Sequence, residues 1–388
     1  MLKIVLSTNY YSNHFTGVDI IAGRLAEFLV LHHDVKIDWV SSDCFPPSKN
    51  RVSVSCFPVK STNFIERKFF IHYPLWKSFP WRELLEIIRS ADVVHLHDYA
   101  YFGNIVIFLI AKMNKKPVVI SQHSRFVAYP SIFVCALLYS LNHTVGKFML
   151  SAADQVIFIS QAVQEHFSKF VRFRSLPVII PNGVDGKVFF PADEAAKQRT
   201  REKLSLNPEQ KMFFFAGRFI EKKGLLILRD LAARFKSVQW VFAGWGPLDP
   251  LQWKLPNVKV FKYLSAAEMA EFYQAADLFI LPSRGEGLPL VIQEAMSCGT
   301  PVMTSTENAS LAQGLQEVVL KETVEGEDAA EQWALQIEKI LSTPQTVLNF
   351  KKKAYDFSVS HWTWKQCTES YAKIFTESIS KEKVRNGR

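Results

Sequence analysis

Residues 278–302, LFILPSRGEGLPLVIQEAMSCGTPV, constrain the fold more than any other stretch of the chain. The stretch begins with four apolar residues, which is the length and composition of a buried strand. A polar loop follows, in which Gly285 and Gly287 flank Glu286. Pro289 then predicts the start of a helix, because proline is favoured at the first helical position. The stretch therefore predicts a strand, a glycine loop and a helix within a parallel α/β sheet.

This glycine loop and the helix after it suit a phosphorylated ligand. Glycine lets the backbone approach closely, and a helix N-terminus directs free N–H groups and a positive dipole end at an anion. The carboxylate of Glu286 stands at the lip of the loop, and Glu294 lies about a turn and a half into the helix. A carboxylate in that place can accept hydrogen bonds from a hydroxyl pair such as that of a ribose. The arrangement indicates a nucleotide-sugar site, and the alternative is an ordinary crossover whose acids are only solvated.

The length of the chain indicates more than one domain. At 388 residues it exceeds what one small core organises, and 48% hydrophobic and 21% charged residues are typical of a globular protein. This length suits two α/β domains, each near the usual size.

Cysteine spacing and the N-terminal residues predict a cytoplasmic protein. The five cysteines include no C-x-x-C pair, which is typical of reduced thiols. The N-terminal residues run directly into an expected strand, and no apolar run has the length of a membrane span. Neither an Asp-x-Asp motif nor a metal-ligand spacing occurs, so no metal and no cofactor are expected.

The net charge of +9 is concentrated in the first half, where residues 1–190 hold 20 Lys and Arg against 13 Asp and Glu. Such an excess indicates an anionic partner: a membrane surface, a phosphorylated lipid or a nucleic acid. Within this half, residues 61–81 interleave aromatic side chains with Arg67, Lys68 and Lys77. The pattern fits an interfacial surface at lipid headgroups, an acceptor loop, or a loop that caps the core. No nucleic acid is expected, because no nucleic-acid-binding motif accompanies the pattern.

Polar residues follow the expected strands of the first half. Gly17 ends the loop after an expected strand at residues 2–7 and precedes an expected helix. This loop is either a cradle for a phosphate or sugar or a plain Rossmann-like turn. After the apolar run at residues 91–96 come His97, Asp98 and Tyr99. The carboxyl ends of parallel strands are where ligands bind in such sheets, so these three are candidates for the acceptor site.

Phosphate-binding groups also follow the expected strand at residues 212–216. Gly217 and Arg218 stand at its end, and Lys223 follows after a short loop. Glycine permits backbone approach, a guanidinium binds phosphate oxygens in pairs, and an ammonium balances the remaining charge. This combination predicts a diphosphate site.

The string from the strand at residue 278 through GEGLP to EAMSCGTPV resembles the E-x7-E signature of retaining GT-B glycosyltransferases of the group 1 (GT4) family. Glu286 and Glu294 match its two glutamates. The resemblance implies two Rossmann-like α/β domains that face each other across a cleft, one over residues 1–190 and one over residues 191–357. Residues 358–380 are expected to return to the first domain. It covers most of the chain and is densest over residues 211–305.

The resemblance also implies roles for individual residues. Arg218 and Lys223 match the diphosphate-binding pair, and His123, after an expected strand at residues 117–120, matches the histidine beside the transferred sugar. Catalysis is then assigned to His123, Arg218, Lys223 and Glu286. The implied donor site comprises Gly17, Gly217, Arg218, Lys223, Tyr263, Leu264, Glu286, Gly287, Leu288, Pro289, Leu290 and Glu294. Tyr263 and Leu264 frame the base in relatives, and an ordinary turn between strand and helix is the alternative.

Together these features predict a metal-independent, retaining transferase that moves a hexose from a UDP- or GDP-sugar to a glycan or lipid-linked acceptor. The basic, aromatic first half suggests bacterial envelope polysaccharide or lipopolysaccharide synthesis at the inner membrane face, with peripheral contact to anionic lipid. The alternatives are a nucleotide-sugar epimerase of the same fold, a nucleic-acid glucosyltransferase and a scaffold without activity. The chain departs from the family at Thr16, at Ser124 and after Ser305, where relatives carry glycines.

Overall fold

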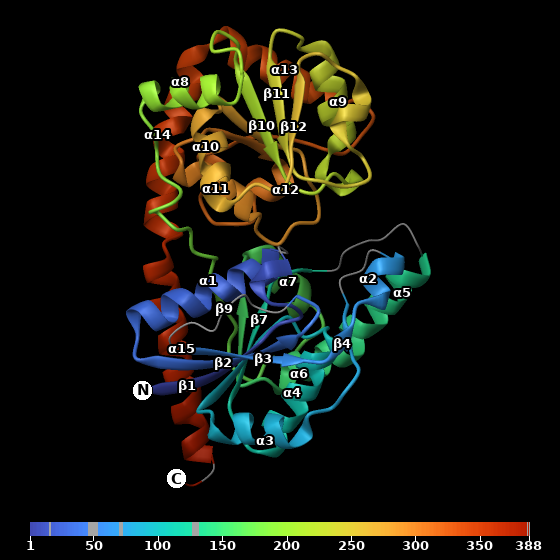
Figure 1. Cartoon of the computed structure of the whole chain (residues 1–388), viewed down its shortest axis with the longest axis vertical. Helices are drawn as coiled ribbons and strands as arrows, with labels where there is room; N and C mark the ends of the chain where they lie inside the picture. Colours follow the sequence, from blue (N-terminus) through green and yellow to red (C-terminus); the bar gives the residue numbers. More distant parts are fainter. Residues whose placement is uncertain (15–16, 46–52, 70–72, 126–131, 386, 388) are drawn as a thin grey trace. The chain divides into compact units, whose positions relative to one another are not determined.

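The chain forms two compact units in the computed structural model, which describes residues 1–14, 17–45, 53–69, 73–125, 132–385 and 387. The first unit comprises residues 1–183 and 364–388, and the second comprises residues 184–363. The sequence analysis placed the corresponding boundaries at residues 190 and 358. Each unit is built on one parallel sheet flanked by helices (Figure 1), so the predicted pair of Rossmann-like α/β domains is confirmed.

The sheet of the first unit has the order β3-β2-β1-β6-β7-β8-β9 among the described residues, and every pair is parallel. Its strands are β1 (Leu2–Ser7), β2 (Val35–Ser42), β3 (Val54–Val59), β6 (Val93–His97), β7 (Val118–Gln122), β8 (Gln155–Phe158) and β9 (Val178–Ile179). An antiparallel ribbon joins β4 (Ser61–Thr62) and β5 (Leu75–Trp76). The strand order reverses between β1 and β6, and ligands bind at such a switch point.

The helices of the first unit include one long C-terminal element. The helical segments are η1 (Ser12–His14), α1 (Gly17–His32), α2 (Phe64–Phe69), α3 (Trp81–Ser90), α4 (Phe102–Met113), α5 (Ile132–Leu141), η2 (Asn142–Gly146), α6 (Lys147–Ala152), α7 (Gln161–Ser168) and α15 (Trp364–Arg385). Residues 126–150 are strongly apolar, which is typical of a buried helix. The structure has three consecutive segments there, α5, η2 and α6, and residues 126–131 lie outside the described part. Helix α15 returns to this unit, as predicted, and packs against α1, β6 and β7.

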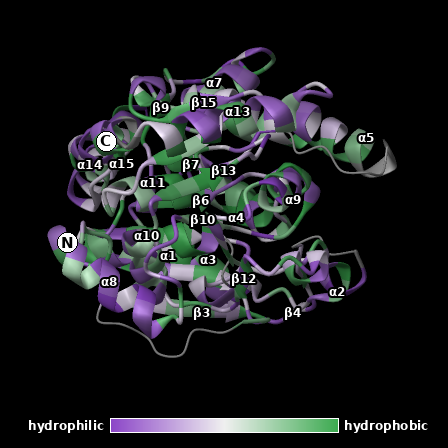
Figure 2. Cartoon of the chain, turned by 90° about the horizontal axis from the view of Figure 1, so that it is seen from above, coloured by the Kyte–Doolittle hydropathy of each residue, from purple (hydrophilic) through white to green (hydrophobic). Residues whose placement is uncertain are grey.

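The sheet of the second unit has the described order β12-β11-β10-β13-β14-β15, again all parallel. Its strands are β10 (Met212–Ala216), β11 (Gln239–Ala243), β12 (Val258–Phe261), β13 (Leu278–Leu281), β14 (Val302–Ser305) and β15 (Leu320–Glu322). This is the dinucleotide-fold order, whose switch point lies between β10 and β13. Both strands are fully buried, and Figure 2 shows β13 in the hydrophobic colour.

The helices of the second unit cover both faces of this sheet (Figure 1). They are α8 (Glu194–Lys203), η3 (Glu221–Lys223), α9 (Leu225–Arg234), η4 (Pro250–Trp253), α10 (Ala266–Ala275), α11 (Leu290–Ser297), α12 (Thr306–Ala309), η5 (Leu315–Glu317), α13 (Ala329–Ser342) and α14 (Pro344–His361). The C-terminal helical region is interrupted at Trp362, so α14 ends in the second unit before α15 begins in the first.

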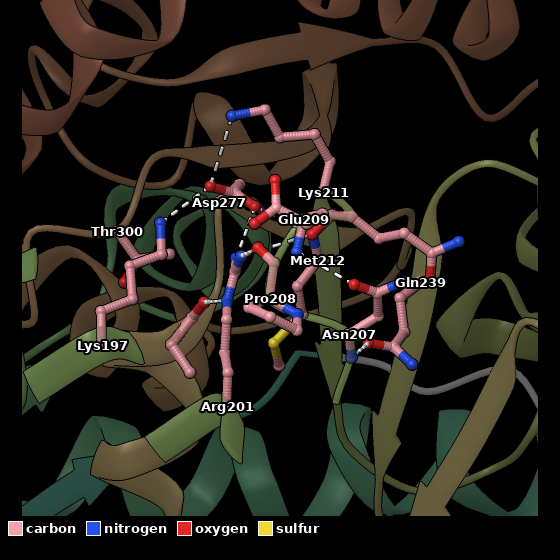
Figure 3. Close-up of polar contacts among 12 residues, drawn as sticks. Lys197, Arg201, Asn207, Pro208, Glu209, Lys211, Met212, Gln239, Asp277 and Thr300 are labelled. Carbon is pink, nitrogen blue, oxygen red and sulfur yellow. Dashed lines mark hydrogen bonds and ion pairs between the residues drawn. The ribbon is translucent and has the colours of Figure 1, made fainter. Parts of the chain in front are cut away.

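A buried ion network ties the amino end of β13 to its surroundings. The Asp277 carboxylate lies 2.7 Å from Lys197 Nζ and 2.6 Å from Arg201 Nη2, with Lys211 Nζ at 3.7 Å. It also accepts a hydrogen bond of 2.8 Å from the backbone N–H of Met212. Figure 3 shows the three cationic side chains directed at this carboxylate. We call these residues the Asp277 cluster, and they join α8, β10 and β13.

Candidate functional site

Two loops of the second unit meet where β10 and β13 end. Gly224 has φ +76, and a Cβ there would lie 2.2 Å from the backbone oxygen of Pro282, so only glycine fits. The N–H of Arg284 donates to the backbone oxygen of Lys222 at 3.0 Å. The loop after β10 and the glycine loop after β13 therefore pack backbone against backbone, and this contact fixes the positions of their side chains.

Lys223 and Glu286, predicted from separate loops, form an ion pair. The Nζ atom of Lys223 lies 2.8 Å from Oε1 of Glu286, and both side chains are largely shielded from solvent. Burial alone would raise the pKa of Glu286, but the positive charges of Lys223 and Lys222 outweigh it and hold that pKa below its ordinary value. The carboxylate is therefore ionised at neutral pH.

Two cations, Lys223 and Lys222, act on this carboxylate, and Arg218 lies near enough to Lys222 to affect its pKa. Burial lowers the pKa of Lys222, Glu286 opposes that shift, and the charges of Lys223 and Arg218 add to it. Arg218 itself is exposed. We call Arg218, Lys222, Lys223 and Glu286 the Glu286 cluster, and its formal charge of +2 suits a diphosphate. Lys222 was not among the predicted site residues, because the family pattern matches only the lysine next to it, Lys223.

The glycine loop continues into the N-terminus of α11. Leu288 is buried and anchors the loop, while Gly287 is partly exposed. The helix begins at Leu290, one residue after the predicted start, so Pro289 occupies the capping position. Among the described residues no side chain caps this end and its first turn holds no acid. Its first N–H groups are therefore suited to an anion.

A carboxylate that was not predicted braces the glycine loop. Gly285, at φ +70, donates its N–H to both Oε atoms of Glu307 at 3.2 and 3.3 Å. Glu307 lies on α12, in the segment where the chain departs from the family pattern. The contact ties the loop that carries Glu286 to the end of β14.

The second glutamate of the motif is oriented by a buried phenol. The hydroxyl of Tyr273, on α10, donates to Oε2 of Glu294 at 2.9 Å. Tyr273 is completely buried. A rigid donor thereby fixes the rotamer of Glu294, which a ribose-binding carboxylate needs.

Exposed aromatic side chains follow the carboxyl ends of two neighbouring strands, β11 and β12. Tyr263 follows β12, is 86% exposed and has φ +58, and the next residue, Leu264, is partly buried. Trp245 follows β11 and is 48% exposed. The register pairs Ala243 with Phe261, so Trp245 and Tyr263 each lie two residues beyond a paired position. Trp245 was missed, although it stands in the GWGP turn, and both rings offer stacking surfaces for a base.

In the first unit, His97 and His123 are in direct contact. His97 Nδ1 lies 2.8 Å from His123 Nε2, and the rings stack at 5.0 Å and 16°. The Asp98 carboxylate accepts the backbone N–H of His123 at 2.8 Å. Burial lowers the pKa of His123 to about 4 and raises the pKa of Asp98 to about 7. The strand ends β6 and β7 thus form a buried polar pair at the predicted edge.

Two further predicted site residues of the first unit, Tyr99 and Gly17, lie in different surroundings. Tyr99 is buried, donates its hydroxyl to Asn142 and packs edge-on against Phe167, so it belongs to the core. Gly17 opens α1, and a Cβ there would meet nothing within 4 Å. Open space at a strand-to-helix loop is compatible with a ligand at Gly17.

Neither a metal-binding cluster nor a membrane-spanning helix occurs among the described residues. No group of three or more His, Cys, Asp or Glu side chains is arranged to hold a metal ion. Every helix in the described ranges is too short or too polar to traverse a bilayer.

Both units of the chain match known protein families. Residues 196–357 match the family described as Glycosyl transferases group 1, and residues 15–187 match Glycosyltransferase Family 4. The chain belongs to the group 1 (GT4-like) glycosyltransferases. The resemblance inferred from the GEGLP string is therefore confirmed.

Individual relatives of this glycosyltransferase are distant. It is 27% identical over 245 residues to a sulfoquinovosyl transferase of Arabidopsis thaliana, across 61% of this chain and 47% of that protein. The chain thus spans about half the length of this relative, and of several other curated relatives.

Solved structures share the fold of the whole glycosyltransferase chain. The sucrose-phosphate synthase of Thermosynechococcus elongatus superposes with a TM-score of 0.74 at 18% identity, covering 98% of this chain and all of that one. Anabaena Alr3699/HepE, solved in complex with UDP-glucose, gives 0.72 at 15% identity, covering 97% and 100%.

Proposed function

We propose that this glycosyltransferase moves a hexose from a UDP- or GDP-sugar to a glycan or lipid-linked acceptor, with retention at the anomeric carbon and without a metal ion. The observation that carries the proposal is the Glu286 cluster, which lies at the switch point of the second sheet beside the open N-terminus of α11. The shared fold with a protein solved with UDP-glucose supports the same class of donor.

The Glu286 cluster supplies the charge that a departing diphosphate requires. The ammonium of Lys223 has three N–H donors, of which one faces Glu286, so the other two are directed elsewhere and can meet phosphate oxygens. Arg218 adds a planar pair of donors, and Lys222 adds a third positive charge. These groups stabilise negative charge as it develops on the leaving group.

In the reaction, the bond between the anomeric carbon and the diphosphate oxygen breaks as the sugar becomes oxocarbenium-like. The acceptor oxygen bonds to the same face, and a leaving phosphate oxygen takes its proton. Glu286 accepts hydrogen bonds from sugar hydroxyls, and Glu294 from the ribose. The family resemblance assigns His123 to the transferred sugar.

The acceptor is proposed to be presented at an anionic membrane surface. Phe64 on α2 is 56% exposed, with Lys68 Nζ 5.7 Å from its ring centroid, and Trp81 at the start of α3 is 45% exposed. Exposed aromatic rings beside cations suit the headgroup region of a bilayer. Residues 70–72 of this segment lie outside the described part. A lipid-linked precursor of an envelope polysaccharide or lipopolysaccharide would meet the enzyme there.

Nucleotide screening tests the donor assignment. The melting temperature of the protein is measured with UDP, GDP and ADP, in EDTA and in magnesium. We expect at least one nucleotide to raise it equally in both buffers, because a ligand of the native state stabilises it by mass action. No shift with any nucleotide, or a shift that requires magnesium, would contradict the proposal. The anomeric configuration of the product, read by NMR, tests retention.

Sedimentation with vesicles tests the membrane assignment separately. The protein should sediment with phosphatidylglycerol vesicles at low salt and remain in solution with phosphatidylcholine vesicles. Replacement of exposed Arg67 and Lys68 by glutamate should abolish sedimentation, whereas Lys236→Glu in the second unit is the matched control and should leave it intact. Equal behaviour of the two variants would remove the surface around α2 from the account.

A further inference from the structure

The contact between His97 and His123 restricts where their protons lie. The 2.8 Å separation of His97 Nδ1 and His123 Nε2 is a hydrogen bond, and such a bond needs one donor and one acceptor. Burial lowers the pKa of both imidazoles, so both rings are neutral at pH 7 and each carries a single proton. One nitrogen of each ring is therefore N–H and the other is a lone-pair acceptor.

The second nitrogen of His97 decides which ring donates. His97 is fully buried, and within the described part of the chain its Nε2 has no hydrogen-bond partner. A proton on Nε2 would leave a buried N–H without an acceptor, which is strongly disfavoured. A proton on Nδ1 is instead accepted by His123. His97 is therefore the donor of the pair.

The neighbouring histidine does not provide an alternative acceptor. His95 lies 4.5 Å from His97 between ring centroids, and its Nε2 shares a 2.8 Å hydrogen bond with Ser121 Oγ. Its Nδ1 also has no partner among the described residues. The proton of His97 consequently has only His123 to meet.

We propose that His97 is a positioning residue that holds His123 in its Nδ1–H tautomer, so that His123 presents a hydrogen-bond donor, and not a base, to the ligand. Nδ1 of His123 makes no hydrogen bond to the part of the protein that the structure describes. A donor at this atom suits a sugar hydroxyl oxygen or another oxygen that gains negative charge. The identity of that ligand rests on the proposed function, in which the acceptor proton goes to the leaving diphosphate.

The backbone around the pair is held rigidly enough to maintain this tautomer. Asn104 Nδ2 donates to the backbone oxygens of His97 and Asp98 at 2.7 and 2.6 Å. The side chain of Asp98 accepts the N–H of His123, and its own N–H donates to the oxygen of Ser121. Both imidazoles thus stand on fixed strand ends, and a substitution at position 97 changes chiefly the partner offered to His123 Nε2.

Histidine NMR on the unliganded wild-type chain tests the tautomer directly. Side-chain ¹⁵N and ¹³C signals of His123 are assigned by comparison with H123Q, and the Nδ1–H pattern is expected. The Nε2–H pattern, or an averaged signal of both tautomers, would overturn the proposal. Because no ligand is present, this result stands or falls independently of the donor assignment.

Matched variants at position 97 test the consequence for turnover. An asparagine amide falls near the place of imidazole Nδ1, and a glutamine amide near that of Nε2. Both H97Q and H97A should lower kcat at least tenfold with KM for the donor changed less than threefold, while H97N should recover most of the loss. Their melting temperatures establish that each variant is folded. Equal activity of H97N and H97Q, in folded protein, would overturn the positioning role.

Discussion

The two ends of strand β13 each carry a carboxylate that interacts with several cationic side chains, yet the two clusters differ in how those cations are engaged. In the Asp277 cluster, Arg201 is buried and donates to the backbone oxygens of Ala275, Pro208 and Gln210 as well as to the carboxylate (Figure 3). In the Glu286 cluster, Lys223 is paired but Arg218 is exposed at the edge of the sheet.

Position on the sheet explains this difference. Asp277 precedes β13, where loops of a parallel sheet serve packing, and Glu286 follows it, where ligands bind at the switch point. We therefore expect the charges at the amino end to stabilise the fold and, under the proposed function, the charges at the carboxyl end to bind a diphosphate. The comparison predicts that substitutions in the Asp277 cluster lower stability with little effect on catalysis. Substitutions in the Glu286 cluster should lower catalysis with little effect on stability.

The largest expected effect is on stability at the amino end. Asp277→Ala leaves Arg201 and Lys197 buried without their carboxylate, so it should lower the free energy of unfolding by about 3 to 5 kcal/mol. Urea denaturation measures this change. At a temperature where the variant is folded, kcat/KM should stay within about twofold of wild type.

An exposed cation at the same carboxylate provides a control for the effect of burial. Lys211 touches the same carboxylate at 3.7 Å but is 58% exposed. Lys211→Ala should therefore cost less than about 1 kcal/mol of unfolding free energy. If it proved as destabilising as Asp277→Ala, the cluster would not act as a buried network.

The next effect is on catalysis at the carboxyl end. Lys223→Ala and Arg218→Ala should each lower kcat/KM by about 2 to 4 kcal/mol of transition-state stabilisation, because both face the developing charge of the diphosphate. The free energy of unfolding should change by only about 1 kcal/mol, since Lys222 remains near Glu286. Unchanged turnover in both variants would remove the phosphate assignment.

Acid titration sharpens the comparison further. Burial would raise the pKa of Asp277, but the charges of Lys197 and Arg201 outweigh it and depress that pKa in the folded state. The stability it contributes is complete above the ordinary carboxyl pKa of about 3.9 and is lost as pH falls through the folded value. Urea midpoints of wild type should therefore drop on acidification below about pH 4, and those of Asp277→Asn should drop less. If the urea midpoints of the two proteins fell equally with pH, Asp277 would not be the source of the acid sensitivity.

The smallest effect is expected at the exposed aromatic edge. Tyr263→Asn keeps a residue that tolerates a positive φ and removes a ring that contacts mostly solvent, so the melting temperature should not change. Calorimetry should show affinity for a nucleoside diphosphate weakened by about 1 kcal/mol and affinity for pyrophosphate unaltered. Equal weakening of both would place Tyr263 away from the base.

Local patterns predicted much of this fold. Between residues 212 and 305, buried apolar runs, glycine turns and helices alternate, and this pattern predicted both the α/β class and the family resemblance. Each of these signals lies within a few neighbouring residues. The break between α14 and α15 was not predicted, since FSVSHWTW holds no glycine or proline to mark it.

Only those site residues that lie within a sequence motif could be predicted from the sequence. Lys223 and Glu286 each stand in a motif of their own and were predicted separately, but their ion pair was not predicted. The Asp277 cluster joins residues from three separate segments, and Glu307 reaches the glycine loop from the helix after the next strand, so neither leaves a local pattern. The contact of His97 with His123 depends on the pairing of β6 with β7, which the sequence suggests only as neighbouring strands.

Calorimetric titration of a nucleoside diphosphate, in EDTA, into wild type, Arg218→Ala, Lys223→Ala and Asp277→Asn measures the central claim most directly. The account predicts that wild type and Asp277→Asn bind with the same affinity, and that the other two variants each bind at least tenfold more weakly. Equal affinity in all four proteins, or binding by none of them, would contradict it.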